Sequence, residues 1–171
     1  MSFDPENIVH MDKIKLRKLK KSDWQYFSKW WRDKDLITLT SGNIEPISDK
    51  QVDRYFSDML NDKTNFHFLI TMEGEAIGHI SLSKRQGAWY ETQIIIGNKR
   101  FWNKGYGTEA IKLLIKKAEK LNINKIYLEV RPDNQRAIKA YEKSGFISRE
   151  IKKYPKNKNL SKTIRMELFE K

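Results

Sequence analysis

Apolar residues recur along the chain at two spacings, every second position in some segments and every third or fourth position in others. The first spacing is typical of strands with one buried face, and the second of amphipathic helices. The sequence therefore predicts strands at residues 14–19, 66–72, 76–83, 88–96, 125–130, 146–153 and 163–169. It predicts helices at residues 22–33, 48–60, 105–121 and 134–144, with an irregular stretch over residues 35–47.

Residues that favour the ends of helices and turns support these boundaries. Ser22 is placed as the N-cap of the first helix, and Ser48 with Gln51 forms a capping-box pattern for the second. Residues 73–74 (Glu-Gly) mark a hairpin turn, and Gly145 closes the last helix. The element order β-α-α-β-β-β-α-β-α-β-β predicts an α/β domain with a mixed sheet.

Length and composition limit the class of protein. A chain of 171 residues with a hydrophobic fraction of 39% fits one domain over residues 1–171, and we expect residues 1–12 to be a poorly ordered lead-in. No apolar run is long enough to span a bilayer, and the N-terminus lacks a signal-peptide pattern, so we expect a cytoplasmic protein without membrane contact. The absence of Cys excludes disulfides, Cys-ligated metals and thiol nucleophiles, and no metal is expected.

The chain is strongly basic, with 34 Lys and Arg residues against 22 Asp and Glu residues and a formal net charge of +12. Such a charge favours an anionic partner, which could be a nucleic acid, the ribosome or a phosphate-rich cofactor. The sequence contains no aromatic-basic RNA motif and no recognition-helix pattern. We therefore expect no direct nucleic-acid binding, while association with the ribosome stays open.

The most informative segment is KRFWNKGYGTEA, between a predicted strand and a long helix. Gly105 and Gly107 would let the backbone approach a phosphate group closely, and the amides of a helix N-terminus bind anions. The segment is not a P-loop, which requires G-x-x-x-x-G-K-[ST]. It is not a dinucleotide fingerprint either, because Ala110 stands at the third glycine position.

The run W-N-K-G-Y-G, from Trp102 to Gly107, resembles motif A of the GNAT acetyltransferases, which binds the pyrophosphate of acetyl-CoA. Trp102 departs from the usual Gln or Arg at its position, and a Trp there resembles the ribosomal-protein N-terminal acetyltransferase branch. The resemblance implies a mixed, mostly antiparallel sheet with splayed central strands and flanking helices. It assigns acetyl-CoA binding to the backbone of Ile94, Ile95 and Ile96 and to Asn103, Lys104, Gly105, Tyr106, Gly107 and Thr108.

The later run LEVRPDNQRAIKAYEKSGF resembles motif B of the same family. By this resemblance, Asn134 would hydrogen-bond the pantetheine arm of acetyl-CoA, and Tyr141 would protonate the departing thiolate. A phenol with its ordinary pKa of about 10 stays protonated at neutral pH, which suits this role. Without Cys, no thiol can carry the acetyl group, so we expect direct transfer to a primary amine.

An acceptor amine must lose a proton before it attacks, and a carboxylate usually takes that proton. Glu129 resembles the glutamate of the ribosomal-protein acetyltransferases, and Glu91 resembles that of the polyamine acetyltransferases, so both stay candidates. We expect the acceptor site between residues 30–47 and 154–162. We expect the acceptor to be a protein N-terminus or a small-molecule amine. The five lysines in KKYPKNKNLSK would repel polyamines and aminoglycosides and favour a peptide N-terminus with acidic neighbours or a ribosome-bound protein.

The alternative functions are a polyamine or aminoglycoside acetyltransferase and a non-catalytic CoA-binding regulatory domain. From the sequence we expect either a monomer or a homodimer.

Overall fold

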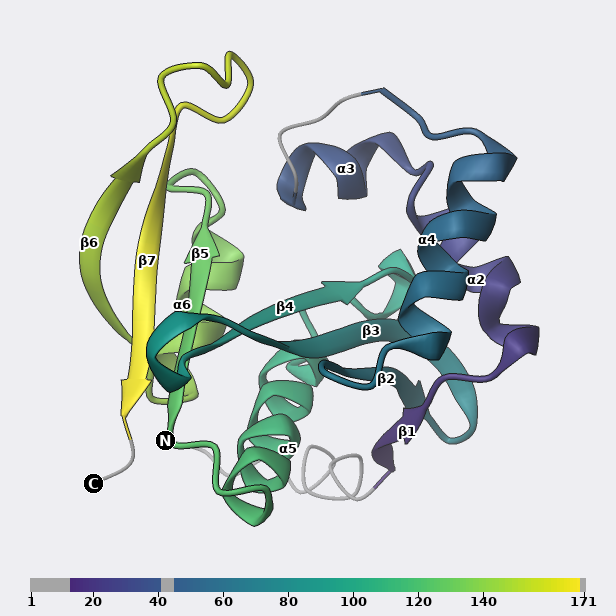
Figure 1. Cartoon of the computed structure of the whole chain (residues 1–171), viewed down its shortest axis with the longest axis horizontal. Coiled ribbons are helices and arrows are strands. Elements are labelled where there is room, and N and C mark those ends of the chain that lie inside the picture. Colours follow the sequence, from purple (N-terminus) through teal and green to yellow (C-terminus); the bar gives the residue numbers. More distant parts are fainter. Residues whose placement is uncertain (1–12, 41–44, 170–171) are drawn as a thin grey trace.

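The computed structural model describes residues 13–40 and 45–169. The lead-in predicted for residues 1–12 lies outside this described part. Seven strands form one twisted sheet in the order β1-β2-β3-β4-β5-β7-β6 (Figure 1). They are β1 (Ile14–Lys18), β2 (Phe66–Met72), β3 (Glu75–Lys84), β4 (Tyr90–Ile96), β5 (Lys125–Val130), β6 (Ile147–Lys153) and β7 (Lys162–Phe169).

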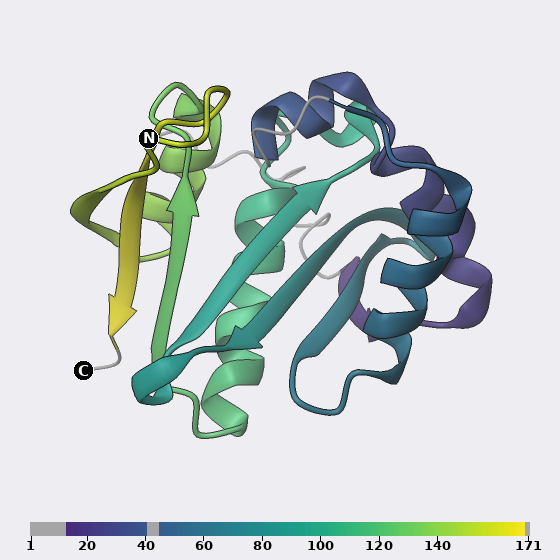
Figure 2. The same ribbon diagram turned by 45° about the horizontal axis from the view of Figure 1, so that its top comes forward.

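All neighbouring strands pair antiparallel except β4 and β5, which run parallel. This single parallel pair needs a crossover, and helix α5 (Tyr106–Lys120) provides it. The β4–β5 ladder holds only two residue pairs, Tyr90 with Ile126 and Glu91 with Tyr127. Beyond these pairs the two strands diverge (Figure 2). The predicted mixed, mostly antiparallel sheet with splayed central strands is therefore confirmed.

Helices cover both faces of the sheet. The apolar stripe of α5 packs on one face, together with α6 (Gln135–Lys143). The opposite face carries α2 (Trp24–Trp30) and α4 (Asp49–Asn61), whose Phe27 and Phe56 rings meet over Leu69. The predicted capping box of α4 is present, because Ser48 and Gln51 bond reciprocally. Strand β4 pairs with β3 along its whole length, from Tyr90 to Ile96, whereas it pairs with β5 only at Tyr90 and Glu91.

The prediction for the first helix was wrong at its start. Ser22 is not the N-cap: residues Lys21–Asp23 form a short 3-10 turn, and α2 begins at Trp24. The reason is the buried carboxylate of Asp23, which accepts bonds from the Lys20 amide at 2.7 Å and from Arg17 at 2.7 and 2.8 Å. This ion pair connects the turn to β1, and α2 begins only after Asp23.

The prediction of an irregular stretch over residues 35–47 was also wrong in part, because α3 occupies Lys34–Thr40. Asp33 begins this helix, since its Oδ1 accepts from the amides of Asp35 at 3.0 Å and Leu36 at 3.3 Å. The β-branched residues that follow are poor helix formers, which hid the helix in the sequence. Burial of Leu36 and Ile37 offsets that preference.

Candidate active site

A cavity of about 720 Å³ lies where β4 and β5 diverge. Its size is typical of small-molecule sites. Parts of α2, α3, the segment before α4, β4, the α5 N-terminus, the end of β5 and α6 line it. In Figure 1, α3 and the loop between β6 and β7 lie on either side of this end of the sheet. The predicted acceptor segment 30–47 therefore lines the cavity at Trp30, Trp31, Leu36, Ile37, Leu39, Thr40, Glu45 and Ile47.

The predicted phosphate-binding turn forms the N-terminus of α5. Gly105 has φ +81°, a left-handed conformation that suits glycine, and it precedes the first helical residue. The first amide that bonds within the helix is that of Glu109, to the Gly105 carbonyl at 3.1 Å. The amides of Gly105 to Thr108 therefore precede the helical ladder and can meet an anion. Asn103, Gly105, Tyr106, Gly107 and Thr108 line the cavity, and Lys104 lies on the same exposed turn.

The positive charge at this end of the cavity comes from residues that sequence reasoning missed. Lys99 is held by Asp33 at 2.9 Å and Asp35 at 2.6 Å, and Arg100 is held by Glu75. The cavity is lined instead by cations of α6, namely Arg136, Lys139 and Lys143. Their spacing of three and four residues puts them on one helix face, and this signal was readable in the sequence.

Trp102, which departs from the usual motif, has a defined structural role. Its Nε1 donates to the Ile96 carbonyl at 2.7 Å, and the Arg136 guanidinium lies 3.9 Å from its ring centroid. Burial lowers the pKa of Arg136, but an Arg stays charged. Trp102 thus ties the end of β4 to α6. Residues along a strand alternate between its two edges, so Ile94 shares the open edge with Ile96, whereas the Ile95 carbonyl lies against Gly78 of β3.

Gly97, directly after β4, is required for close packing. A Cβ at Gly97 would lie 2.3 Å from ring atoms of Trp30, so no other residue fits without displacing that ring. Trp30 stacks on Tyr26 and contacts the edge of Phe27. Trp30 therefore belongs to both the core and the cavity wall, and the partly buried Trp31 lines the cavity beside it.

Thr92 lies one residue past the last β4–β5 pair, at the closed end of the cavity. It is 3% exposed, and its hydroxyl has no hydrogen-bond partner among the described residues. A buried hydroxyl without a partner is costly, and native proteins rarely keep one without reason. Thr92 is a second functional candidate that sequence reasoning missed.

Asn134 and Tyr141 both line the cavity from α6, as the motif predicted. The Asn134 Oδ1 caps the helix by accepting from the Ala137 amide at 3.2 Å, so only its amide group can donate to a ligand. Tyr141 is buried, packs edge-on against Phe146, and has no hydroxyl partner within the described residues. Burial raises the pKa of Tyr141 well above its ordinary value, so the phenol keeps its proton.

Glu129 also lines the cavity, and two hydroxyls hold its carboxylate. Thr163 donates to its Oε2 at 2.6 Å, and Tyr154, from the loop between β6 and β7, donates to the same oxygen. Burial and the Glu129 carboxylate raise the pKa of Tyr154 to about 12. The Glu129 Oε1 carries no bond from the described residues and is the oxygen that a ligand can meet.

Glu91 is placed differently from Glu129. Its carboxylate accepts from Arg85 at 2.6 and 2.9 Å, and Glu91 is absent from the cavity lining. The lysines of the 152–162 loop are likewise absent from that lining. The loop reaches the site only through Tyr154 and through the Asn159 carbonyl, which accepts from Arg131 at 3.2 Å.

Within residues 13–40 and 45–169, no helix is both long and apolar enough to cross a bilayer. In the same ranges, no three His, Cys, Asp or Glu side chains gather as metal ligands would.

Comparison with known proteins places this arrangement in a family. The family model described as an acetyltransferase (GNAT) domain matches residues 13–147. An uncharacterized N-acetyltransferase, p20, from Bacillus licheniformis is 25% identical over 153 residues, covering 81% of this chain and 84% of that protein. The aminoglycoside N(6')-acetyltransferase type 1 of Klebsiella pneumoniae is 24% identical over 149 residues, covering 79% and 74%.

A solved structure shares the same fold. The spermidine N-acetyltransferase of Vibrio cholerae, in complex with CoA and spermine, superposes with a TM-score of 0.80 at 21% identity over 92% of this chain and 96% of that one.

The chain belongs to the GNAT acetyltransferase family. This confirms the predicted fold class and the predicted class of enzyme, an acetyl-CoA-dependent N-acetyltransferase. The finer resemblance to the ribosomal-protein branch stays a prediction.

Proposed function

We propose that this enzyme transfers acetyl from acetyl-CoA directly to the primary amine of a small molecule whose body is mainly apolar. The observation that carries the proposal is one cavity in which Tyr141 and Glu129 share the wall with the free amides of the α5 N-terminus. The orphan hydroxyl of Thr92 at its closed end also fits a bound thioester chain, which supplies the missing partner.

Each residue receives a role from its position. The amides of residues 105–108 and the cations of α6 bind the phosphates, and the Ile94 backbone, on the open edge of β4, holds the pantetheine arm. Acetyl-CoA supplies the activated acetyl thioester. Tyr141 gives its phenolic proton to the departing sulfur, and the phenol holds that proton at neutral pH.

Glu129 serves the acceptor side of the reaction. Its Oε1 accepts a proton from the acceptor ammonium, directly or through one water, while Thr163 and Tyr154 hold Oε2 in place. Glu91 receives no role in this proposal, since Arg85 neutralises it outside the cavity.

The cavity wall indicates the kind of acceptor. Aromatic and aliphatic side chains make up most of the acceptor half, which is lined by Trp30, Trp31, Tyr55 and the α3 residues Leu36, Ile37 and Leu39. The lining acids of the described part are Glu45 and Glu129, whereas Arg131 and three α6 cations provide positive charge. Such a wall suits one ammonium group on an apolar body better than a polyamine or an aminoglycoside.

A thiol-release assay with acetyl-CoA and an amine panel tests the proposal. The panel holds apolar monoamines such as phenethylamine, a peptide with a free apolar N-terminus, spermidine and kanamycin. We expect the highest kcat/KM among the apolar monoamines. If the peptide has the highest kcat/KM, the result would support the predicted protein N-terminal acetyltransferase. If spermidine or kanamycin has the highest kcat/KM, the result would contradict the proposal of an apolar acceptor. Thiol release that no amine accelerates would support the non-catalytic alternative.

A further inference from the structure

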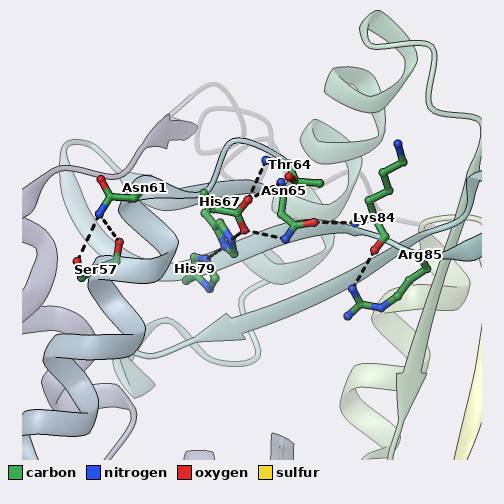
Figure 3. Close-up of polar contacts among 9 residues, drawn as sticks. Ser57, Asn61, Thr64, Asn65, His67, His79, Lys84 and Arg85 are labelled. Atoms are coloured by element: carbon green, nitrogen blue, oxygen red, sulfur yellow. Dashed lines mark hydrogen bonds and ion pairs between the residues drawn. The ribbon is translucent and has the colours of Figure 1, made fainter.

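Two histidines on adjacent strands meet beside the cavity. His67 lies on β2 and His79 on β3, and the His67 Nδ1 is 3.3 Å from the His79 Nε2 (Figure 3). Their ring planes differ by 14° and their centroids are 5.5 Å apart. Because the nitrogens are much closer than the centroids, the rings meet edge to edge, as in a hydrogen bond between imidazoles. One of the two nitrogens must therefore donate to the other.

A carboxylate lies at the outer end of this pair. The Oδ2 of Asp62, just after α4, is 3.6 Å from the His67 Nε2. The backbone amides of Asn65 and Thr64 and the Asn65 side chain all donate to Asp62, at 2.7 to 3.0 Å. These bonds lower the pKa of Asp62 to about 2, so it is an anion at neutral pH. An anion at this position favours the His67 form that carries its proton on Nε2.

The inner end of the pair opens into the cavity. His79 is one of the lining residues, and it pairs with Ile95 of β4 across the β3–β4 ladder. The edge of the Phe27 ring, 5.1 Å away between centroids, packs on the His79 ring. Burial lowers the pKa of His79 to about 3, so the ring is neutral and carries one proton.

The position of each proton follows along the pair. Because Asp62 holds the His67 proton on Nε2, the His67 Nδ1 carries a lone pair. This nitrogen therefore accepts a hydrogen bond from the His79 Nε2–H. A neutral imidazole with its proton on Nε2 has a lone pair on Nδ1. His79 is thereby set as a hydrogen-bond acceptor in the cavity wall, where Trp30 and Ile95 also lie.

We propose that the His79 Nδ1 accepts a hydrogen bond from an N–H group of the acceptor, and that Asp62 and His67 fix the His79 tautomer for this contact. His79 is then a substrate-binding residue, and His67 and Asp62 are positioning residues. The inference rests on the proposed function for its substrate, but the tautomer itself can be measured without any acceptor.

The first test is long-range ¹H–¹⁵N NMR of the imidazoles, assigned with His67→Asn and His79→Asn. We expect both rings in the neutral form protonated at Nε2. Asp62→Ala should add a population protonated at Nδ1, whereas Asp58→Ala, which removes an exposed α4 carboxylate, should change neither ring. A His79 ring protonated at Nδ1 in the wild type would overturn the inference.

The second test uses the best amine of the panel. His79→Phe keeps a planar ring without the nitrogen, and we expect it to raise the acceptor KM about tenfold with the acetyl-CoA KM within about twofold. His79→Asn retains an acceptor oxygen near the Nδ1 position and should recover most of the loss. A purely structural His79 would change both KM values together or neither, and either result contradicts the inference.

A failure of the proposed function would look different. In that case no amine is acetylated, yet the same amines can be titrated into the CoA-bound protein. A shift of the His79 Nδ1 resonance then supports the contact, and its absence refutes it.

Discussion

Thr92→Val separates ligand binding from stability, because the structure predicts opposite effects on the two. The side chain keeps its shape, and the substitution replaces a hydroxyl that is 3% exposed and has no partner among the described residues. An unsatisfied buried hydroxyl costs about 1–3 kcal/mol. Removing it should raise the free energy of unfolding of the ligand-free protein by about 1 kcal/mol, or the melting temperature by about 2–4 °C.

The same substitution should weaken cosubstrate binding. Loss of one neutral hydrogen bond costs about 0.5–1.5 kcal/mol, which corresponds to a roughly 2- to 12-fold rise in the Kd of acetyl-CoA. Calorimetry with acetyl-CoA and with CoA locates the contact. If Thr92 meets the acetyl group, only acetyl-CoA binds more weakly, and if it meets the pantetheine arm, both do.

Thr71→Val is the matched control. Thr71 is 5% exposed on β2, and its hydroxyl donates to the Lys15 carbonyl at 3.4 Å, away from the cavity. This variant should lose stability and bind acetyl-CoA normally. The reasoning is refuted if Thr92→Val behaves in the same way, with a less stable fold and an unchanged Kd.

Three further predictions follow from the site. Gly107→Ala should leave the fold intact, because its Cβ would meet only Ile96 at 3.8 Å, but calorimetry should show at least tenfold weaker acetyl-CoA binding, while Lys112→Ala changes little. Tyr154→Phe should raise the acceptor KM, because it removes one of the two hydroxyls that hold the Glu129 carboxylate. The pKa of Tyr154 is raised to about 12 in the folded protein, so the Tyr154 hydroxyl should stabilise the wild type by a constant amount below about pH 10. Urea titrations should show this contribution lost between about pH 10 and 12. Lys156→Glu with Lys158→Glu should change kcat/KM for apolar amines less than twofold, since neither lysine lines the cavity, and a larger effect would return the loop to the acceptor site.

The parts of the site that the sequence predicted are those set by local geometry. The turn that we propose binds phosphate depends on Gly105, whose positive φ and place before a helix can be inferred from neighbouring residues. Asn134 and Tyr141 lie seven residues apart, so two turns of α6 carry both to the cavity whatever the rest of the fold does.

The parts that were missed depend on contacts between distant segments. Lys99 opens the segment KRFWNKGYGTEA, yet its charge is taken up by Asp33 and Asp35, which only the position of α3 brings to it. In the sequence Thr92 is an ordinary strand residue. Only the structure, in which β4 and β5 separate after Glu91, shows that its hydroxyl has no hydrogen-bond partner among the described residues. The sequence could not distinguish Glu91 from Glu129 as the base. Only the tertiary structure shows that Arg85 pairs with Glu91 and that Glu129 lines the cavity.

The most direct test of the central claim is Tyr141→Phe in a thiol-release assay with acetyl-CoA and the best acceptor. The substitution removes only the hydroxyl of a buried ring that lines the cavity, so folding and the calorimetric Kd of acetyl-CoA should be unchanged. Loss of a positioned acid should lower kcat by about 10²-fold or more. An unchanged kcat would show that Tyr141 only packs in the core and that the sulfur receives its proton elsewhere.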